Sequence, residues 1–174
     1  GKTVDEGIYH RLLVSRPVFP LGKDIGFLPG DIEEKLNPWM QPFYDNIDFL
    51  FGSTSSKGRR GVGKGAQELM NQGLLQIEPL TYIRGRSIPQ QFLIVDEAQN
   101  LTPHEIKTIL TRAGDDTKIV LTGDSFQIDN PYVDAANNGL VYLVDKFKDE
   151  SIAAHITLTK GERSKLSELA SNLL

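Results

Sequence analysis

The stretch that decides the fold runs from Phe92 to Gln127 and reads FLIVDEAQNLTPHEIKTILTRAGDDTKIVLTGDSFQ. It contains two continuous apolar runs, Phe92–Val95 and residues 118–122, and polar residues follow each run at once. Continuous rather than alternating apolar residues are typical of strands that are buried on both faces, as in a parallel sheet. The stretch therefore predicts two neighbouring parallel strands.

A helix is predicted between these two runs. The segment from Thr102 to Glu105 has the pattern of a capping box, with proline at the first helical position. Apolar residues then repeat at helical spacing, at Ile106, Ile109, Leu110 and Ala113, before Gly114 ends the pattern. Strand, helix and strand in this order predict an α/β layered domain with a mainly parallel sheet.

Outward from this stretch, further elements are expected. Arg11–Ser15 is a third apolar strand, and residues 75–83, interrupted by Pro79, and the alternating residues 155–159 are expected as edge strands. Two amphipathic helices are also predicted. One opens at Asn37-Pro38, carries Trp39, Phe43, Ile47 and Leu50 on one face and ends before Gly52; the other carries Leu166, Leu169, Ala170 and Leu173.

Composition narrows the class of protein. The 174 residues fit one globular domain, residues 1–174, and their formal charge of −4 lacks the positive field of a non-specific nucleic-acid binder. Without cysteine there is no disulfide and no thiolate site. No apolar run approaches the ~20 residues that span a bilayer. We expect a cytoplasmic protein without a membrane segment.

A glycine-rich basic segment, residues 52–65, is predicted to be a mobile loop. It carries Lys57, Arg59, Arg60 and Lys64. Two interpretations stand: a solvated surface insertion, or a contact to a phosphate backbone.

The chemistry is expected where the three best strands end, because ligands collect at the carboxyl ends of parallel strands. These ends read Ser15-Arg-Pro17, Asp96-Glu-Ala-Gln99 and Gly123-Asp-Ser-Phe-Gln127. An Asp-Glu pair after an apolar strand is the Walker B arrangement, in which Asp holds Mg²⁺ and Glu polarises the attacking water. Alone, such a pair is more often an acidic pair at a helix N-terminus, which the helix dipole favours. Asp124 and Gln127 would add a carboxylate and an amide able to sense a γ-phosphate.

Together these motifs resemble the PhoH family of ATPases, within the superfamily 1 helicase-type P-loop ATPases. The resemblance covers residues 8–174. It rests on those three strand ends and on GKDIGFLPGDIEEKLNPWMQPFYDN (residues 22–46), LTYIRGRSIP (80–89), IVDEAQNLTPHEIKTILTR (94–112), LTGDSFQIDNPY (121–132) and LTKGERS (158–164).

The resemblance implies a RecA-like P-loop fold with helices on both faces of the sheet and binding of ATP and Mg²⁺. It also implies RNA or another single-stranded nucleic acid as the polymer, helicase activity and a ring-shaped homo-oligomer. Asp96 would hold the metal, Glu97 would activate water, and Arg163 would reach the γ-phosphate. The implied nucleotide-state sensors are Gln99 and Gln127, and the implied nucleic-acid residues include Arg16, Thr81, Arg84 and Arg86. Two alternatives without a functional role remain: Arg16 pairs with an acidic neighbour, or Arg163 is only a charge at a helix start.

One departure concerns the Walker A loop, whose pattern is GxxxxGK[ST]. Only Gly1, Lys2 and Thr3 stand at the N-terminus, seven residues before the first strand. Lys2 and Thr3 either belong to the end of a helix that follows a missing Walker A, which we favour, or are a remnant of the loop itself. In both cases most of the phosphate cradle is expected outside these 174 residues, and the chain alone is expected to bind ATP weakly.

Two other functions compete with a Mg-ATPase coupled to RNA. One is a non-catalytic fragment that binds nucleic acid or sister subunits. The other is a two-carboxylate metal hydrolase built on Asp96, Glu97 and Asp124, which the scattered histidines disfavour.

Overall fold

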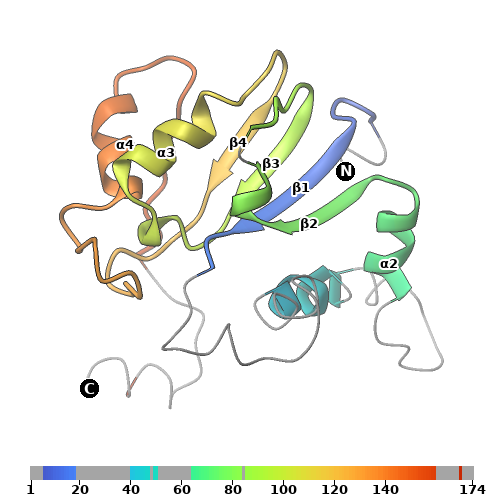
Figure 1. Cartoon of the computed structure of the whole chain (residues 1–174), viewed down its shortest axis with the longest axis horizontal. Coiled ribbons are helices and arrows are strands. Elements are labelled where there is room, and N and C mark those ends of the chain that lie inside the picture. The colour runs from blue at the N-terminus through green and yellow to red at the C-terminus, as the bar shows by residue number, and fades with distance from the viewer. Residues whose placement is uncertain are drawn as a thin grey trace. The chain divides into compact units, whose positions relative to one another are not determined.

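The sheet has four parallel strands. The computed structural model describes residues 6–18, 40–47, 49–50, 64–83, 85–159 and 169. Strands β1 (Arg11–Arg16), β2 (Leu75–Pro79), β3 (Gln91–Val95) and β4 (Lys118–Leu121) follow the order β2-β1-β3-β4 (Figure 1). The described helices include residues 40–47, α2 (Lys64–Asn71), α3 (Pro103–Leu110) and α4 (Gly139–Phe147), with the short 3-10 helices η2 (Leu80–Ile83) and η3 (Ala98–Asn100). The expected α/β fold with a parallel sheet is confirmed.

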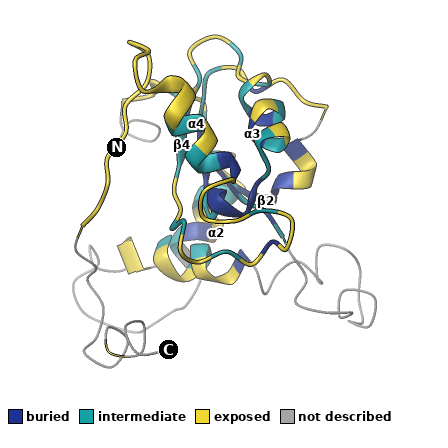
Figure 2. Cartoon of the chain, turned by 90° about the vertical axis from the view of Figure 1, so that its left-hand side faces the viewer, coloured by how far each residue is buried: buried dark blue, intermediate teal, exposed yellow. Residues whose placement is uncertain are grey.

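In each strand alternate residues point to opposite faces, so both faces of the sheet carry apolar side chains. Helices cover both of these faces. Leu13, Leu93 and Val95 pack with Ile106 and Ile109 of α3 and with η2. On the opposite face the buried residues Val14, Leu75 and Ile77 pack with Met40 and Ala66, and Ile94, Phe43, Tyr44, Ile47, Leu69 and Met70 are packed against them. Figure 2 shows these buried residues gathered in the sheet and on the helices beside it.

Helix α3 begins as the sequence predicts. Glu105 N donates to Thr102 Oγ1 at 3.3 Å, and Thr102 N donates to Glu105 Oε2 at 2.9 Å, which completes a capping box with Pro103 in the first turn. The start of α3 and the ends of β3 and β4 together fix the positions of the loops at the carboxyl edge of the sheet.

The helix expected after Pro38 is present over residues 40–47, but its buried face is rotated from the expected one. Met40 is buried and packs with Phe43, Tyr44 and Ile47, whereas Leu50 is 65% exposed. Trp39 lies outside the described residues. Met40 and Tyr44, one helical turn apart, make the apolar contact to the sheet. We had expected that contact from Trp39 and Leu50, the first and last residues of the predicted apolar face.

Strand β2 lies at one edge, as predicted for a strand that contains proline, and its last residue is Pro79. The continuation to Ile83 is the 3-10 helix η2 instead of strand. Strand β4 forms the other edge, so its residues 119–121 are only partly buried.

The predicted strand at residues 155–159 is wrong for the described structure, which assigns no strand there. A strand needs a hydrogen-bonding neighbour, and the described sheet pairs only β1 to β4. Of the predicted loop, residues 52–63 lie outside the description, and α2 already begins at Lys64 because Ala66, Leu69 and Met70 pack on the sheet. The predicted C-terminal stripe also lies outside, apart from Leu169, which is 56% exposed.

The contacts divide the chain into two compact units, Gly1–Leu143 and Val144–Leu174. The single domain expected from the sequence stays a prediction. Among the described residues, no helix is long and apolar enough to cross a membrane.

Candidate nucleotide-hydrolysis site

The acidic pair lies where β3 leaves the sheet. Asp96 N donates to Ser15 O at 2.9 Å, so the backbone is still held against β1 at this point. Thr122, directly after β4, donates from Oγ1 to Asp96 Oδ1 at 2.6 Å. Two neighbouring strand ends therefore fix the orientation of the Asp96 carboxylate.

Glu97 adopts a backbone conformation that is uncommon for a residue with a side chain. Its φ is 54° and its ψ is 36°, in the left-handed region, and it immediately precedes η3. Such conformations cost about 1–3 kcal/mol and are concentrated at functional sites. Asp96 and Glu97 alone connect β3 to η3, and the Glu97 carboxylate stays partly exposed at the edge of the sheet.

Gln99 connects the acidic pair to the loop after β4. Its side chain is completely buried, and Nε2 donates to Glu97 Oε2 at 2.6 Å and to Gln127 O at 2.8 Å. Its Oε1 accepts from Asp124 N at 3.2 Å. Gly123 passes so close that an added Cβ would collide with Gln99 Oε1. One amide side chain thus holds Glu97, Asp124 and Gln127 in a fixed relation.

The loop after β4 is a compact turn around Asp124. Gln127 Nε2 donates to Asp124 Oδ2 at 2.7 Å, and Phe126 N donates to Asp124 Oδ1 at 3.0 Å. The Gln127 side chain is exposed, in contrast to that of Gln99. The structure therefore brings together Asp96, Glu97, Gln99, Asp124 and Gln127, as the strand ends predicted. Their individual roles stay predictions, and of the two expected sensors only Gln127 offers its side chain to a ligand.

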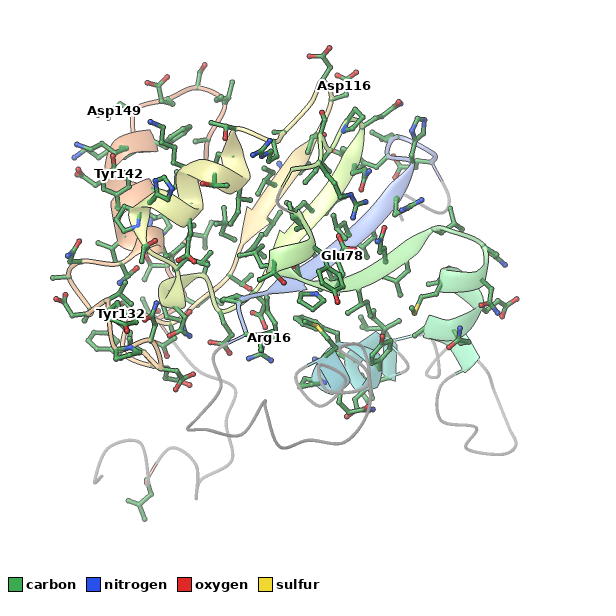
Figure 3. The ribbon with its side chains drawn as sticks, in the orientation of Figure 1. Arg16, Glu78, Asp116, Tyr132, Tyr142 and Asp149 are labelled. Atoms are coloured by element: carbon green, nitrogen blue, oxygen red, sulfur yellow. The ribbon has the colours of Figure 1, made fainter. Side chains whose placement is uncertain are left out.

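The predicted nucleic-acid residues lie at the ends of β1 and β2 and beyond. Arg16 ends β1, and its Nη2 lies 3.5 Å from Glu97 Oε1, so the acidic neighbour considered from the sequence is Glu97 itself. Thr81 is exposed on η2. Arg86 is 43% exposed and donates from Nη1 to the buried carboxylate of Glu78 at 2.8 Å (Glu78 and Arg16 are labelled in Figure 3).

Four predicted site residues, Lys2, Thr3, Arg84 and Arg163, lie outside the described part of the chain.

The sequence did not predict a second set of hydrogen bonds that holds the loop after β4. The buried Asn100 accepts from Asp129 N at 2.7 Å and from Asn130 N at 3.1 Å through Oδ1, and Asn130 Nδ2 donates to Asn100 O at 2.8 Å. It also missed Thr122 and Glu78. The local signal was Asn130 directly before Pro131, which indicates a turn because asparagine favours turns. No local pattern indicates that Asn130 bonds Asn100, which lies 30 residues away.

A cleft lies beside this site, between η2, α3 and the chain after β1. Its volume is about 80 Å³, and it is lined by Pro17, Val18, Leu80, Thr81, Ile83, Leu101, Glu105, Thr108, Ile109 and Arg112. None of the acidic-site residues lines this cleft, so it is separate from the candidate hydrolysis site.

The donor set at Asp96 suits Mg²⁺ better than a metal held entirely by protein. No group of three or more His, Asp or Glu side chains in the described residues could hold a metal ion. Mg²⁺ is commonly bound by one or two carboxylates, with phosphate and water completing its six ligands. A single carboxylate oriented by Thr122 fits that need.

Comparison with known proteins agrees with this arrangement. The family model described as PhoH-like protein matches residues 2–173. The chain belongs to the PhoH-like family. It is 56% identical over 173 residues to protein PhoH2 of Bacillus subtilis and 38% identical over 167 residues to protein PhoH2 of Thermobispora bispora, which covers 99% and 95% of the chain. A PhoH-like protein of Bacillus subtilis is 38% identical over 125 residues, 72% of the chain.

The membership confirms the family that the motifs indicated. The PhoH-like chain nevertheless spans only 38%, 36% and 36% of these three relatives. The activity and partners of the whole protein are therefore matters for proposal.

Proposed function

We propose that this PhoH-like chain is the hydrolysis module of a Mg-dependent ATPase that acts on single-stranded RNA. One observation carries the ATPase part. The Asp96–Glu97 pair leaves the sheet beside the loop after β4, and Gln99 ties Glu97 to both Asp124 and Gln127. Such an arrangement can position water and detect a γ-phosphate with little rearrangement, which is how P-loop enzymes accelerate phosphoryl transfer.

In this proposal each acidic residue has one task. Asp96, oriented by Thr122, holds Mg²⁺, which when bound neutralises charge on the β- and γ-phosphates. Glu97 polarises the water that attacks the γ-phosphate, and Gln127 contacts the nucleotide. Gln99 is buried and acts through the residues that it holds.

The decisive experiment uses a longer protein in which a Walker A sequence precedes residue 1. Glu97→Gln should abolish turnover while ATP stays bound, because the change removes the carboxylate that polarises water and leaves the metal ligand. Asp96→Asn should also weaken Mg-dependent binding. Glu68→Gln, a change on α2, is the matched control and should keep wild-type turnover. Equal turnover in wild type and Glu97→Gln contradicts the assignment.

Calorimetry with ATP on residues 1–174 alone tests whether these residues bind phosphate without a complete Walker A loop. These residues contain no GxxxxGK[ST] sequence, and the backbone N–H groups of that loop supply much of the phosphate binding. We expect weak or undetectable ATP binding. Low-micromolar affinity would show that Gly1, Lys2 and Thr3 already form a working cradle.

The RNA part of the proposal is supported by basic and polar side chains at the carboxyl ends of β1 and β2. Arg16 and Arg86 are partly exposed, and Thr81 is exposed. Each phosphate contact contributes to the salt dependence of binding, with a slope of about 0.7 per contact on a single strand. Arg86→Ala should therefore lower RNA affinity and reduce the salt slope. An unchanged slope removes Arg86 from the interface and leaves it as the partner of Glu78.

We further propose that the active form is a homo-oligomer, probed through Arg163. An arginine that neutralises the γ-phosphate charge is worth ~10³ or more in rate. Mixing Arg163→Ala with Glu97→Gln subunits of the longer protein should restore activity when the arginine acts across a subunit interface. If Arg163→Ala alone stays within a few-fold of wild type, Arg163 does not act on the γ-phosphate. A monomer by light scattering would refute the oligomer.

A further inference from the structure

Arg16 occupies the boundary between the two groups of candidate residues. In the strand order β2-β1-β3-β4, the end of β1 lies between the end of β2, which leads to Thr81 and Arg86, and the end of β3, which leads to Asp96 and Glu97. The Arg16 side chain is 19% exposed, so solvent and ligands reach part of it. Its guanidinium carbon lies 5.9 Å from the centre of the Phe43 ring. Arg16 is thus anchored on one side and accessible on the other.

The Glu97 carboxylate is held at both of its oxygens. Oε2 accepts from Gln99 at 2.6 Å, and Oε1 lies 3.5 Å from Arg16 Nη2. Charged N–H···O bonds are commonly about 2.7–2.9 Å long. The contact to Arg16 is therefore the looser of the two, and it is the one that a competing anion can replace. Each oxygen keeps a further lone pair, but the Arg16 contact fixes Oε1 and places a positive charge beside it, which opposes the pull of Oε1 on a water molecule.

We infer that Arg16 restrains Glu97 in the RNA-free protein and that a phosphate of the bound strand draws Arg16 away, so that RNA binding releases Glu97 to polarise water. The inference rests on the proposed function and makes Arg16 a positioning residue. The competition is physical: RNA phosphate and the Glu97 carboxylate are anions that seek the same guanidinium. Gln99 keeps its bond to Oε2, so release frees one oxygen without displacing the residue.

Linkage makes this competition measurable without ATP hydrolysis. If RNA weakens the hold of Arg16 on Glu97, the Glu97 charge must weaken RNA binding by the same factor. Glu97→Gln removes the charge and keeps the shape, so it should tighten binding of a single-stranded RNA by about fivefold, the lower end of typical coupling between sites. In an Arg16→Ala background the same change should have no effect, because the shared residue is gone.

The kinetic test compares basal and RNA-stimulated turnover in the longer, Walker-A-containing protein. Arg16→Ala should raise basal turnover several-fold and abolish stimulation by RNA, since Glu97 is no longer restrained. A residue needed only for folding would lower both rates. The matched control is Arg11→Ala, at the other end of the same strand, where the side chain bonds Gly73 O and Gln76. Arg11→Ala should keep both the basal rate and the stimulation.

The outcomes separate this inference from the proposed function. If the wild-type protein turns over ATP but Arg16→Ala lowers its basal rate or leaves RNA stimulation intact, the restraint does not exist. If the wild-type protein does not turn over ATP, the proposed function fails, and the RNA affinities of wild type and Glu97→Gln still test the pairing. Equal RNA affinities of wild type and Glu97→Gln overturn the inference. This comparison uses no Arg16 variant, so it holds even if Arg16→Ala does not fold.

Discussion

Gln99 donates a hydrogen bond of 2.6 Å to the carboxylate of Glu97, two residues before it, although the Gln99 side chain is completely buried. The same Nε2 reaches Gln127 O, and Oε1 accepts from Asp124 N. The residue therefore links the candidate base to the loop after β4 through the interior of the protein. A ligand-induced movement of that loop would be transmitted to Glu97 through one amide group.

Replacing Gln99 tests the importance of this link for stability. Gln99→Leu keeps a similar volume but leaves Asp124 N and Gln127 O without their buried partner. We expect the free energy of unfolding to fall by about 1–3 kcal/mol, because two partly buried backbone groups lose their hydrogen-bond partner. Urea denaturation measures it. The control is Gln67→Leu on the exposed face of α2, which should stay within ~0.5 kcal/mol; equal losses in the two variants contradict the buried link.

Gly139, at the start of α4, offers a test of close packing. A Cβ added there would lie 2.8 Å from Leu101 O and 2.9 Å from Thr102 O, and it would collide with Ile106. Gly139→Ala should therefore cost about 2–3 kcal/mol in thermal or urea unfolding, as overpacking of a core does.

The control is Gly73→Ala, where φ is +72° and no atom lies within 4 Å of the added Cβ. It carries only the left-handed backbone penalty of about 1–2 kcal/mol. A larger loss at Gly73 than at Gly139 would show that the start of α4 is less tightly packed than the structure indicates.

The capping box of α3 predicts a smaller loss. Thr102→Ala removes the acceptor for Glu105 N and should lower the free energy of unfolding by about 1 kcal/mol. Thr111→Ala, at the exposed end of the same helix, is the matched change, and its hydroxyl bonds only backbone oxygens of Lys107 and Thr108. Calorimetric melting of both variants should show the loss for Thr102 alone; a shift of the same size for Thr111 would remove the capping box as its cause.

Asp145 provides a prediction about pH. A hydrogen bond from Lys148 at 3.0 Å, with the charge of Lys148 and then of Lys146, lowers the pKa of the Asp145 carboxyl. Because the folded pKa lies below the unfolded one, the associated stabilisation is present above the unfolded pKa and is lost as pH falls through the folded pKa. Lys148→Gln should raise the pKa of Asp145 more than Lys146→Gln does, as followed by NMR titration of the carboxyl. The reverse order would contradict the hydrogen bond to Lys148.

Local signals were enough for much of the fold. The apolar runs predicted β1, β3 and β4, and the box at Thr102 predicted the start of α3 because its bonds join residues three apart. Parallel strands then required their polar ends to meet, which predicted the grouping of Asp96 with Asp124. The phase of the helix at residues 40–47 could not be predicted, because Met40 and Leu50 are both apolar and only the packed sheet selects between them.

Side-chain links between distant segments were also out of reach. Nothing near Asp96 indicates Thr122, which is 26 residues away, and nothing near Asn100 indicates Asn130. The resemblance to the PhoH family implied Gln99 as a sensor of the nucleotide; its side chain is instead completely buried, and Gly123 approaches it closely.

The strand order also has a consequence for the synthesis of the protein. Strand β1 lies in the middle of the sheet, yet β2 and β3, its two neighbours, follow it by more than 60 residues and by about 80 residues. Ribosomes add roughly 5–20 residues per second, so the β3 side of β1 waits about 4–16 s for its partner. During this time the backbone of β1 on that side lacks its hydrogen-bonding partner. This side of β1 should therefore be open to mispairing until translation reaches Val95.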